Sequence, residues 1–573
     1  MKLPFSLLSL FAAGALLADP PRHPVYEPDG KDPQGRPAAT LEAGTKPHLT
    51  PVSMRQRFGR DALSRVPIPK RFTLGFRGWR GERVSEQVLI ECLAGFEEVR
   101  LDPCVLRTAD GREIPVRLDL VRYTVGAGVL FADILDGDAQ PSLKGVVRPL
   151  VLTVDIPADV APGEATGTLS LRVNGTPLSA PVALTIDPET LPPPREWKCH
   201  LDIWQHPDAV ARWHDVPMWS DAHFALMRPY MERLADAGQK TITATLIDEA
   251  WDRQTYDAFG PMVRVTKRKD GSWAYDFSVF DRWVAFMSEE IGLRDATVSC
   301  YGLLPWSLTF AYHDEAQGRT VAPKLTPGTP DYEAFWGPYL EALVAHVRGK
   351  GWEDRVRLAM DERPDALFRP ALEVVRRHAP SLKIVAACNA PSAITTDFDD
   401  CSYGLNICER LVPLAKERHA QGKFTTFYVC CAQPRPNTFA HSALAEAEWL
   451  LPAAAHYGLD GFLRWAYQSW TEDPFVSQDY RPANWPAADT SLVYPGNRSS
   501  LRWEALRNGV ETFEKIRLLR EKAARLGRPE ALEPLEAALG AFTVARGMGP
   551  DCPYEADLIT LDEALLQAAE ALR

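Results

Sequence analysis

Two adjacent carboxylates, Asp361 and Glu362, end an apolar segment in the stretch RVRLAMDERPDALF. Before them, Val356, Leu358 and Met360 recur at every second position, which is the period of a β-strand. Like charges this close repel, and burying them costs free energy unless they share a proton or meet a ligand. One carboxyl of such a pair can stay neutral and act as a general acid. The competing interpretation is a solvated strand end, with Asp361 capping the next helix.

The strand itself sets a condition on this pair. Adjacent residues of a regular strand point to opposite faces. Both carboxylates can therefore face one site only if the strand ends or kinks at Met360. The sequence leaves open which of the two is charged and which is protonated.

The surrounding pattern predicts how the pair is positioned. Apolar strand-like segments alternate with amphipathic helical ones such as residues 331–350, where aromatic and aliphatic residues follow helical spacing. The strand-like segments are 199–204, 241–247, 296–304, 356–360, 383–388, 400–407, 424–431 and 460–467. Eight β/α units predict a (β/α)8 TIM-type barrel over residues 195–498. A doubly wound sheet is the alternative, but no Gly-rich phosphate loop follows any strand. Residues 499–573 are predicted to be helices packed on the barrel.

The N-terminal part has a different organisation. Residues 1–18 resemble a secretory signal peptide, and residues 19–70 form a Pro/Gly-rich arm or linker. Short alternating strands predict a β-sandwich over residues 71–190, with a hairpin turn at Asn174-Gly175.

Composition excludes several classes of function. The formal net charge is -12 and no Lys/Arg run is present, which argues against nucleic acid. No apolar run long enough to span a membrane follows the signal, so we expect an exported bacterial protein, periplasmic or secreted. The ten cysteines show no metal-binding or redox spacing. We expect Cys430 and Cys431 to be small buried residues, and we expect no metal or other cofactor.

The C-terminal ends of the strands are where a barrel gathers its functional groups. Aromatic and amide side chains are frequent there and acids are few, which is typical of a carbohydrate site. The candidate substrate-binding residues are Trp204, Asn389, Tyr428, Asn437, Trp465, Tyr467 and Trp470. The predicted partner is a glycan or glycoconjugate, and the oligomeric state stays open.

The seventh strand suggests a mechanism. A retaining glycosidase with two carboxylates needs a nucleophile about 5 Å from its acid. Many barrel glycosidases place the acid after strand 4 and the nucleophile after strand 7, but residues 424–437 contain no carboxylate. A 2-acetamido group of the substrate can replace the nucleophile. Glu362 would then be the acid, and Asp361 would orient and stabilise the acetamido group.

Three alternatives remain at this point, one of which is a scaffold whose sandwich domain contacts cell-surface glycans. A second acidic pair, Asp248 and Glu249, ends the second predicted strand and could supply the acid of a different glycosidase. A non-catalytic barrel could also hold a glycan without cleaving it.

Several longer motifs add a family resemblance over roughly residues 70–525. They are LDIWQHP, PYMERLADAGQKTITAT, AMDERP, TTFYVCC, DGFLRWAYQSW, DTSLVYPG and RSSLRWEALRNGVETFEKIRLLR. With them the chain resembles glycoside hydrolase family 123. The resemblance implies a β-sandwich before a (β/α)8 barrel, and a β-N-acetylgalactosaminidase that retains configuration by substrate-assisted catalysis. It maps the orienting residue onto Asp361 and the acid/base onto Glu362. Activity on β-GlcNAc or another hexosaminide is the alternative specificity.

Overall fold

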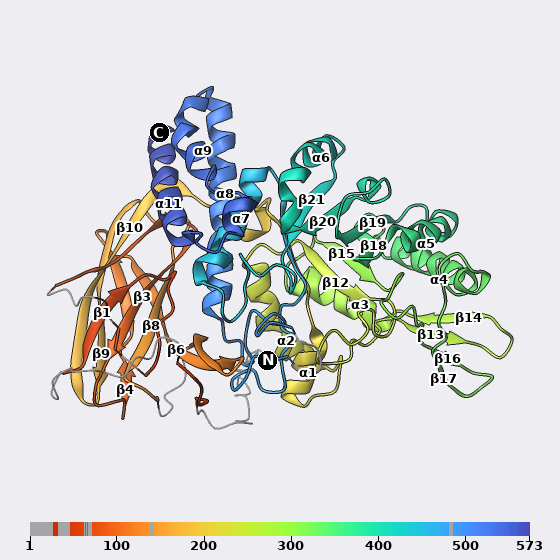
Figure 1. The fold of residues 1–573 in the computed structure, drawn as a ribbon, viewed down its shortest axis with the longest axis horizontal. Coiled ribbons are helices and arrows are strands. Elements are labelled where there is room, and N and C mark those ends of the chain that lie inside the picture. Colours follow the sequence, from red (N-terminus) through yellow and green to blue (C-terminus); the bar gives the residue numbers. More distant parts are fainter. Residues whose placement is uncertain are drawn as a thin grey trace, which may run out of the picture.

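The computed structural model of the protein describes residues 27–32, 46–61, 63–64, 66, 71–137, 143–480 and 485–573. The predicted signal peptide and much of the predicted arm lie outside these residues. The chain has several parts: a sheet-rich N-terminal region, a barrel-like parallel sheet with its helices, and C-terminal helices over the junction of the two (Figure 1).

The N-terminal region contains ten strands in the order β1-β3-β8-β6-β5-β9-β10-β2, with β4 paired to β9 and β7 paired to β6. Their bounds are β1 His48–Val52, β2 Leu74–Arg80, β3 Arg83–Glu91, β4 Val99–Leu101, β5 Cys104–Thr108, β6 Glu113–Gly126, β7 Val129–Asp136, β8 Val147–Asp155, β9 Gly163–Val173 and β10 Thr176–Thr190. Strand β1 belongs to the predicted arm and pairs antiparallel with β3.

The predicted hairpin joins β9 and β10. Asn174 and Gly175 both have positive φ angles, 48° and 78°, as the tight hairpin turn requires. Leu169, Leu171 and Val173 are buried, so the alternation read from the sequence gives the inward face of β9. The sheet-rich character is confirmed, whereas its division into a two-layer sandwich stays a prediction.

The second region is built on an eight-stranded parallel sheet in the order β11-β22-β21-β20-β19-β18-β15-β12. Its strands are β11 His200–Ile203, β12 Thr241–Thr245, β15 Thr297–Tyr301, β18 Val356–Asp361, β19 Lys383–Cys388, β20 Asp400–Gly404, β21 Phe424–Tyr428 and β22 Gly461–Arg464. Each predicted strand segment overlaps with one of them, and β18 extends one residue beyond its segment, to Asp361. The first and last strands of this order approach each other, because the Lys240 amide donates to the Leu201 carbonyl over 2.9 Å. The sheet is therefore barrel-like.

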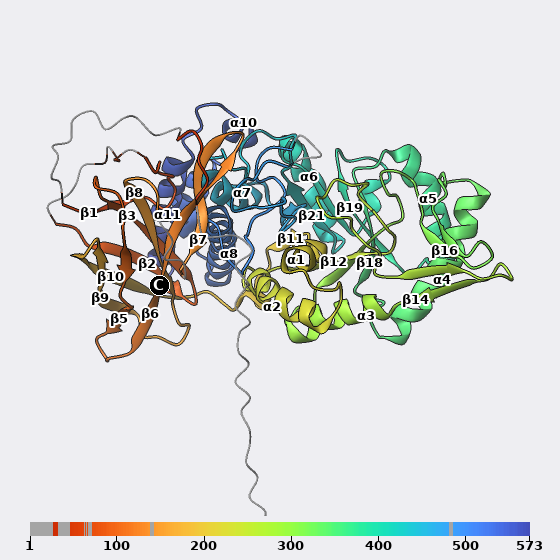
Figure 2. The ribbon, with the colours of Figure 1, turned by 90° about the horizontal axis from the view of Figure 1, so that it is seen from below.

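Helices connect and cover these strands (Figures 1 and 2). They are α1 Pro207–His214, α2 Asp221–Ala235, α3 Ser278–Ala285, α4 Pro330–Gly349, α5 Asp365–His378, α6 Cys408–Ala420 and α7 Leu444–Tyr457. A small sheet projects from the far end of this region, formed by β13 Arg264–Lys267, β14 Trp273–Asp276, β16 Tyr312–Asp314 and β17 Arg319–Val321. The C-terminal helices are α8 Leu501–Leu526, α9 Glu533–Leu539, α10 Val544–Gly547 and α11 Tyr554–Ala571. Short helical turns are η1 Pro194–Glu196, η2 Phe286–Glu290, η3 Thr395–Asp397, η4 Leu405–Ile407 and η5 Pro529–Leu532.

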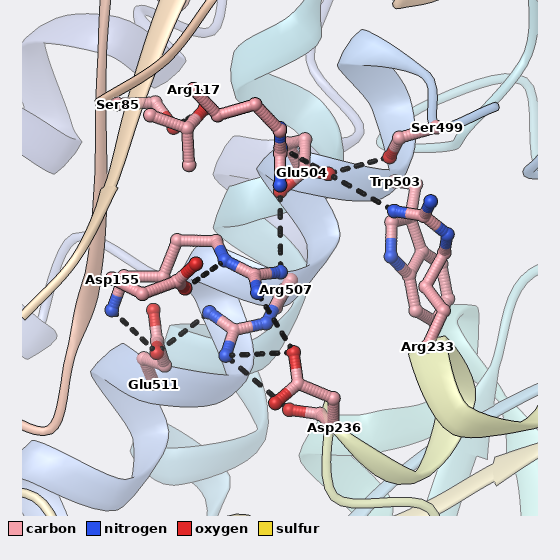
Figure 3. Close-up of polar contacts among 12 residues, drawn as sticks. Ser85, Arg117, Asp155, Arg233, Asp236, Ser499, Trp503, Glu504, Arg507 and Glu511 are labelled. Carbon is pink, nitrogen blue, oxygen red and sulfur yellow. Dashed lines mark hydrogen bonds and ion pairs between the residues drawn. The ribbon is translucent and has the colours of Figure 1, made fainter. Parts of the chain in front are cut away.

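A buried charge cluster joins the parts (Figure 3). Glu504 near the start of α8 lies within 4.0 Å of Arg83 and 3.7 Å of Arg117 from the sheet-rich region, and 3.8 Å of Arg233 from α2. Burial alone would raise the pKa of Glu504, but the three guanidinium groups outweigh it and hold the pKa at about 2. The Ser499 hydroxyl also donates to Glu504, over 2.5 Å.

Two properties of the described residues bear on function. None of the helices there is long and apolar enough to cross a membrane. Within the same residues, no group of three or more His, Cys, Asp or Glu side chains is arranged to hold a metal ion.

Candidate active site

The acidic pair lies at the end of β18, where the chain leaves the regular strand. Asp361 is the last strand residue, and Glu362 follows with φ of 41°, in the left-handed region that side chains other than glycine rarely adopt. The Glu362 amide still donates to the Ala387 carbonyl of β19, over 2.9 Å. The required kink therefore comes at Glu362, two residues after Met360, and both carboxyls line the same cavity.

This cavity has a volume of about 230 Å³ and a mostly apolar wall that includes six aromatic side chains. Trp204 and Trp251 contact each other with ring centroids 5.3 Å apart, and Trp465 meets Trp485 edge to face at 6.1 Å. The lining residues are Trp204, Trp251, Gln254, Trp306, Asp361, Glu362, Ala387, Tyr428, Val429, Cys430, Cys431, Leu463, Trp465 and Trp485. Aromatic faces and two carboxyls in one small cavity suit a sugar ring.

Asp361 is held by one polar contact and has a shifted pKa. The Trp306 indole N–H donates to its Oδ2 over 3.0 Å. Burial raises the pKa of Asp361 to about 7 and the neighbouring charge of Glu362 adds to the rise, while Trp306 and Arg363 act in the opposite direction. The Arg363 guanidinium lies 4.7 Å from the centre of the Trp306 ring. Asp361 can therefore change its charge near neutral pH.

Glu362 has a different partner. The Tyr428 hydroxyl, at the end of β21, donates to Glu362 Oε1. Burial raises the pKa of Tyr428, and the charge of Glu362 raises it further. Tyr428 is thus a neutral donor that orients this carboxyl from the end of β21.

Three of the predicted substrate-binding residues line the cavity: Trp204, Tyr428 and Trp465. Asn389 does not belong to the lining and is exposed in the loop that follows β19. All four residues lie at or just after the end of a strand, but the position alone does not determine which side chains point into the cavity.

The other three predicted residues have structural contacts instead, which corrects their proposed role. Asn437 is buried and its Nδ2 donates to the carbonyls of Cys430 and Gln433, so that it braces the loop after β21. The Tyr467 hydroxyl donates to the Tyr230 carbonyl over 3.1 Å.

The same correction applies to Trp470. Its indole N–H donates to the Val493 carbonyl over 2.8 Å, and its ring packs edge to face on Trp213 and Tyr230. Strand β22 ends at Arg464, so Trp470 comes well after the mouth of the sheet and folds into the core.

Sequence reasoning missed other residues of the wall. Trp306 follows the third predicted strand and Trp251 follows the acidic pair of the second, but neither is among the predicted substrate-binding residues. Gln254 and Trp485 lie far along their loops, and no local signal marks them; the structure shows Trp485 donating to the Gln254 carbonyl over 3.3 Å. Cys431 is exposed and Cys430 is half-buried, which corrects the expectation that both are buried.

The second acidic pair stays outside the cavity wall. Asp248 and Glu249 follow β12, and neither belongs to the lining. The Glu249 carboxylate accepts from the Arg253 amide of its own loop over 2.8 Å. This contact gives Glu249 a structural role in its own loop.

Comparisons with known proteins agree with this geometry. The sequence profile of the glycoside hydrolase 123 catalytic domain matches residues 204–519. A solved family 123 glycoside hydrolase from Clostridium perfringens, described for glycolipid glycan hydrolysis, superposes with a TM-score of 0.82 at 20% identity, covering 92% of this chain and 99% of that one.

Other solved structures are much less similar. A putative β-galactosidase from Bacteroides fragilis has a TM-score of 0.28 at 10% identity, covering 72% of this chain and 56% of that chain. A β-glucuronidase from Bacteroides uniformis has a TM-score of 0.28 at 11% identity, covering 76% and 50%. No curated protein matches the sequence. Since the family profile spans more than half of the chain and includes both carboxylates, the chain belongs to glycoside hydrolase family 123 and is a glycosidase.

Proposed function

We propose that the protein removes terminal β-linked N-acetylgalactosamine from glycans or glycoconjugates, and that the 2-acetamido group of the substrate is the nucleophile. The observation that carries the proposal is the acid inventory of the cavity. Among the described residues that line it, the carboxyl side chains are Asp361 and Glu362. They are neighbours on one strand end, so neither stands across the cavity as a separate enzymatic nucleophile would.

The two carboxyls then have different tasks. Glu362 protonates the glycosidic oxygen as the acetamido carbonyl oxygen attacks the anomeric carbon. The ionised Asp361 accepts the acetamido N–H and stabilises the positive charge of the oxazolinium ring. Glu362 next removes a proton from the attacking water, and two displacements restore the β configuration.

Local contacts support this division. The Trp306 indole occupies Asp361 Oδ2, which leaves Oδ1 for the acetamido N–H. The Tyr428 hydroxyl fixes Glu362 by donating to its Oε1. An N–H donor from the substrate favours the carboxylate form of Asp361, whose pKa lies at about 7 without it. Binding of an acetamido sugar would therefore itself favour ionisation of Asp361.

The proposal extends to the fold and to the location of the protein. We infer that the parallel sheet closes as a (β/α)8 barrel behind a β-sandwich and that the chain is exported. The galacto configuration rests on the family, so cleavage of β-GlcNAc would leave the mechanism unchanged and correct the sugar. A non-catalytic glycan binder is less well supported, because it has no use for a strained acid pair at Glu362.

A panel of 4-nitrophenyl β-glycosides that differ at C2 and C4 tests the function. We expect hydrolysis of the β-GalNAc glycoside and none of the β-galactoside, because the latter lacks the acetamido carbonyl. Proton NMR of the first product should show the β-anomer. Equal rates on a 2-hydroxy substrate, or an α-anomer appearing first, would exclude substrate assistance.

A further inference from the structure

The loop after β21 places two adjacent thiols, Cys430 and Cys431, in the wall of the catalytic cavity. Tyr428, which donates to Glu362, precedes them by two residues. Cys431 is exposed, whereas seven of the ten cysteines are buried and two are half-buried. A reagent in the cavity would thus meet Cys431 before any other thiol.

The loop holds this pair in a fixed position. The Gln433 side-chain carbonyl accepts from the Cys430 amide over 2.9 Å and lies 3.4 Å from Cys430 Sγ. Asn437 donates to the carbonyls of Cys430 and Gln433, over 3.0 and 2.6 Å. Hydrogen bonds to Gln433 and Asn437 therefore fix the backbone of Cys430, and the neighbouring Cys431 lines the cavity.

We propose that Cys431 is a covalent modification site for neutral, thiol-reactive sulfur compounds, and that a group bonded to its sulfur blocks entry of the sugar. The inference rests on the proposed function only in taking this cavity as the catalytic one. The Cys431 thiolate attacks the sulfenyl sulfur of a thiosulfonate, a new S–S bond forms, and the sulfinate leaves with the electron pair of the broken bond. A dithiol reverses the reaction by reducing the mixed disulfide.

Cys430 assists as a positioning residue. The hydrogen bond between the two thiols lowers the pKa of Cys431 and raises that of Cys430, so the exposed sulfur is the one that ionises. Partial burial, Asp489 and Glu362 oppose the Cys431 thiolate, while Arg464 favours it. For comparison, burial raises the pKa of the half-buried Cys552 to about 11.

The test uses benzyl methanethiosulfonate on the full chain, with labelling followed by peptide mass spectrometry and turnover on the β-GalNAc glycoside. We expect Cys431 to be labelled about tenfold or more faster than Cys552. Turnover should fall in proportion and return with dithiothreitol, and excess N-acetylgalactosamine should slow the labelling.

Variants are scored as the fraction of their own untreated activity. Cys431→Ser should resist the reagent, the control Cys552→Ser should stay as sensitive as the wild type, and Cys430→Ala should be labelled several-fold more slowly at neutral pH because its donor is gone. Loss of activity in treated Cys431→Ser, or full activity with Cys431 labelled, would overturn the proposal. If no glycoside is turned over, the proposed function fails, while the labelling rates and their slowing by the sugar still decide the question of the thiol.

Discussion

The hydrogen bond from Trp306 to Asp361 should set the pH at which the enzyme becomes active. Trp306→Phe removes the indole donor but keeps an aromatic ring under the Arg363 guanidinium, which lies 4.7 Å from the ring centre. The donor favours the carboxylate, so its loss favours the neutral acid and raises the pKa of Asp361. Only ionised Asp361 can accept the acetamido N–H and stabilise the oxazolinium ring. As the pH is lowered, the variant should therefore lose activity at a higher pH than the wild type.

The magnitude follows from the exposure of the site. A hydrogen bond to a charged group contributes about 1.5–3 kcal/mol. Asp361 is half-buried, so we take the lower end, about 1.5 kcal/mol, which corresponds to about one pKa unit. From its position at about 7, the acid limb of kcat/KM should therefore move to about 8. At about pH 6 this is a loss of about tenfold, and the loss should shrink as the pH rises past the new pKa.

The assay is the pH profile of kcat/KM on an acetamido glycoside, which reports groups of the free enzyme. Trp273→Phe is the matched control, because Trp273 is also a half-buried tryptophan under a cation, with Lys267 5.7 Å from its ring centre, and lies outside the cavity. Its profile should equal that of the wild type. A Trp306→Phe enzyme that loses the same factor at every pH would refute the reasoning, because the indole would then not control the charge of Asp361.

Three further outcomes follow from the site. Glu362→Gln should cost on the order of 100- to 10,000-fold in turnover of an unactivated glycan with an unchanged circular dichroism spectrum, whereas Glu249→Gln should be mild; the reverse result would move the acid to the second pair. Folding raises the pKa of Asp361 from 3.8 to about 7, so the neutral carboxyl is favoured in the folded state, and this contribution to stability is complete below pH 3.8 and is lost as the pH rises to about 7. Asp361→Asn, which stays neutral, should therefore raise Tm more at pH 8 than at pH 4. An equal shift in Tm at both pH values would contradict this prediction. Tyr428→Phe should lower kcat/KM with little change in Tm, and Tyr467→Phe should lower Tm with little change in kcat/KM, which thermal melts and initial rates can distinguish.

The sequence located the acid pair because strand periodicity and chemistry coincide there. Apolar residues at every second position predicted β18, and the two carboxyls at its end had no structural use in a strand. The sequence showed that a kink was needed to bring the two carboxyls together, but it could not show where the kink lies. The φ of 41° at Glu362 is set by tertiary contacts rather than by residue type.

The substrate-binding residues were harder to predict for a physical reason. An aromatic side chain packs in a core as readily as it lines a cavity, and its local sequence is the same in both cases. Tyr467 and Trp465 are two positions apart, yet Trp465 faces the cavity and Tyr467 is buried against Trp503. Trp485 reaches the cavity from the long loop after β22, and only the three-dimensional path of that loop reveals it.

The buried carboxylate of Glu504 has a consequence for how this enzyme can be divided or recombined. Its charge is balanced by arginines that come from both sides of the junction, so a chain cut between the sheet-rich region and the parallel sheet would leave Glu504 without Arg83 and Arg117. An uncompensated buried charge costs several kcal/mol, a large part of the stability of a domain. The N-terminal region is therefore not a detachable accessory module. Exchange of this region between relatives would succeed only if the incoming sheet carried matching cations, and the whole chain should melt as one cooperative unit.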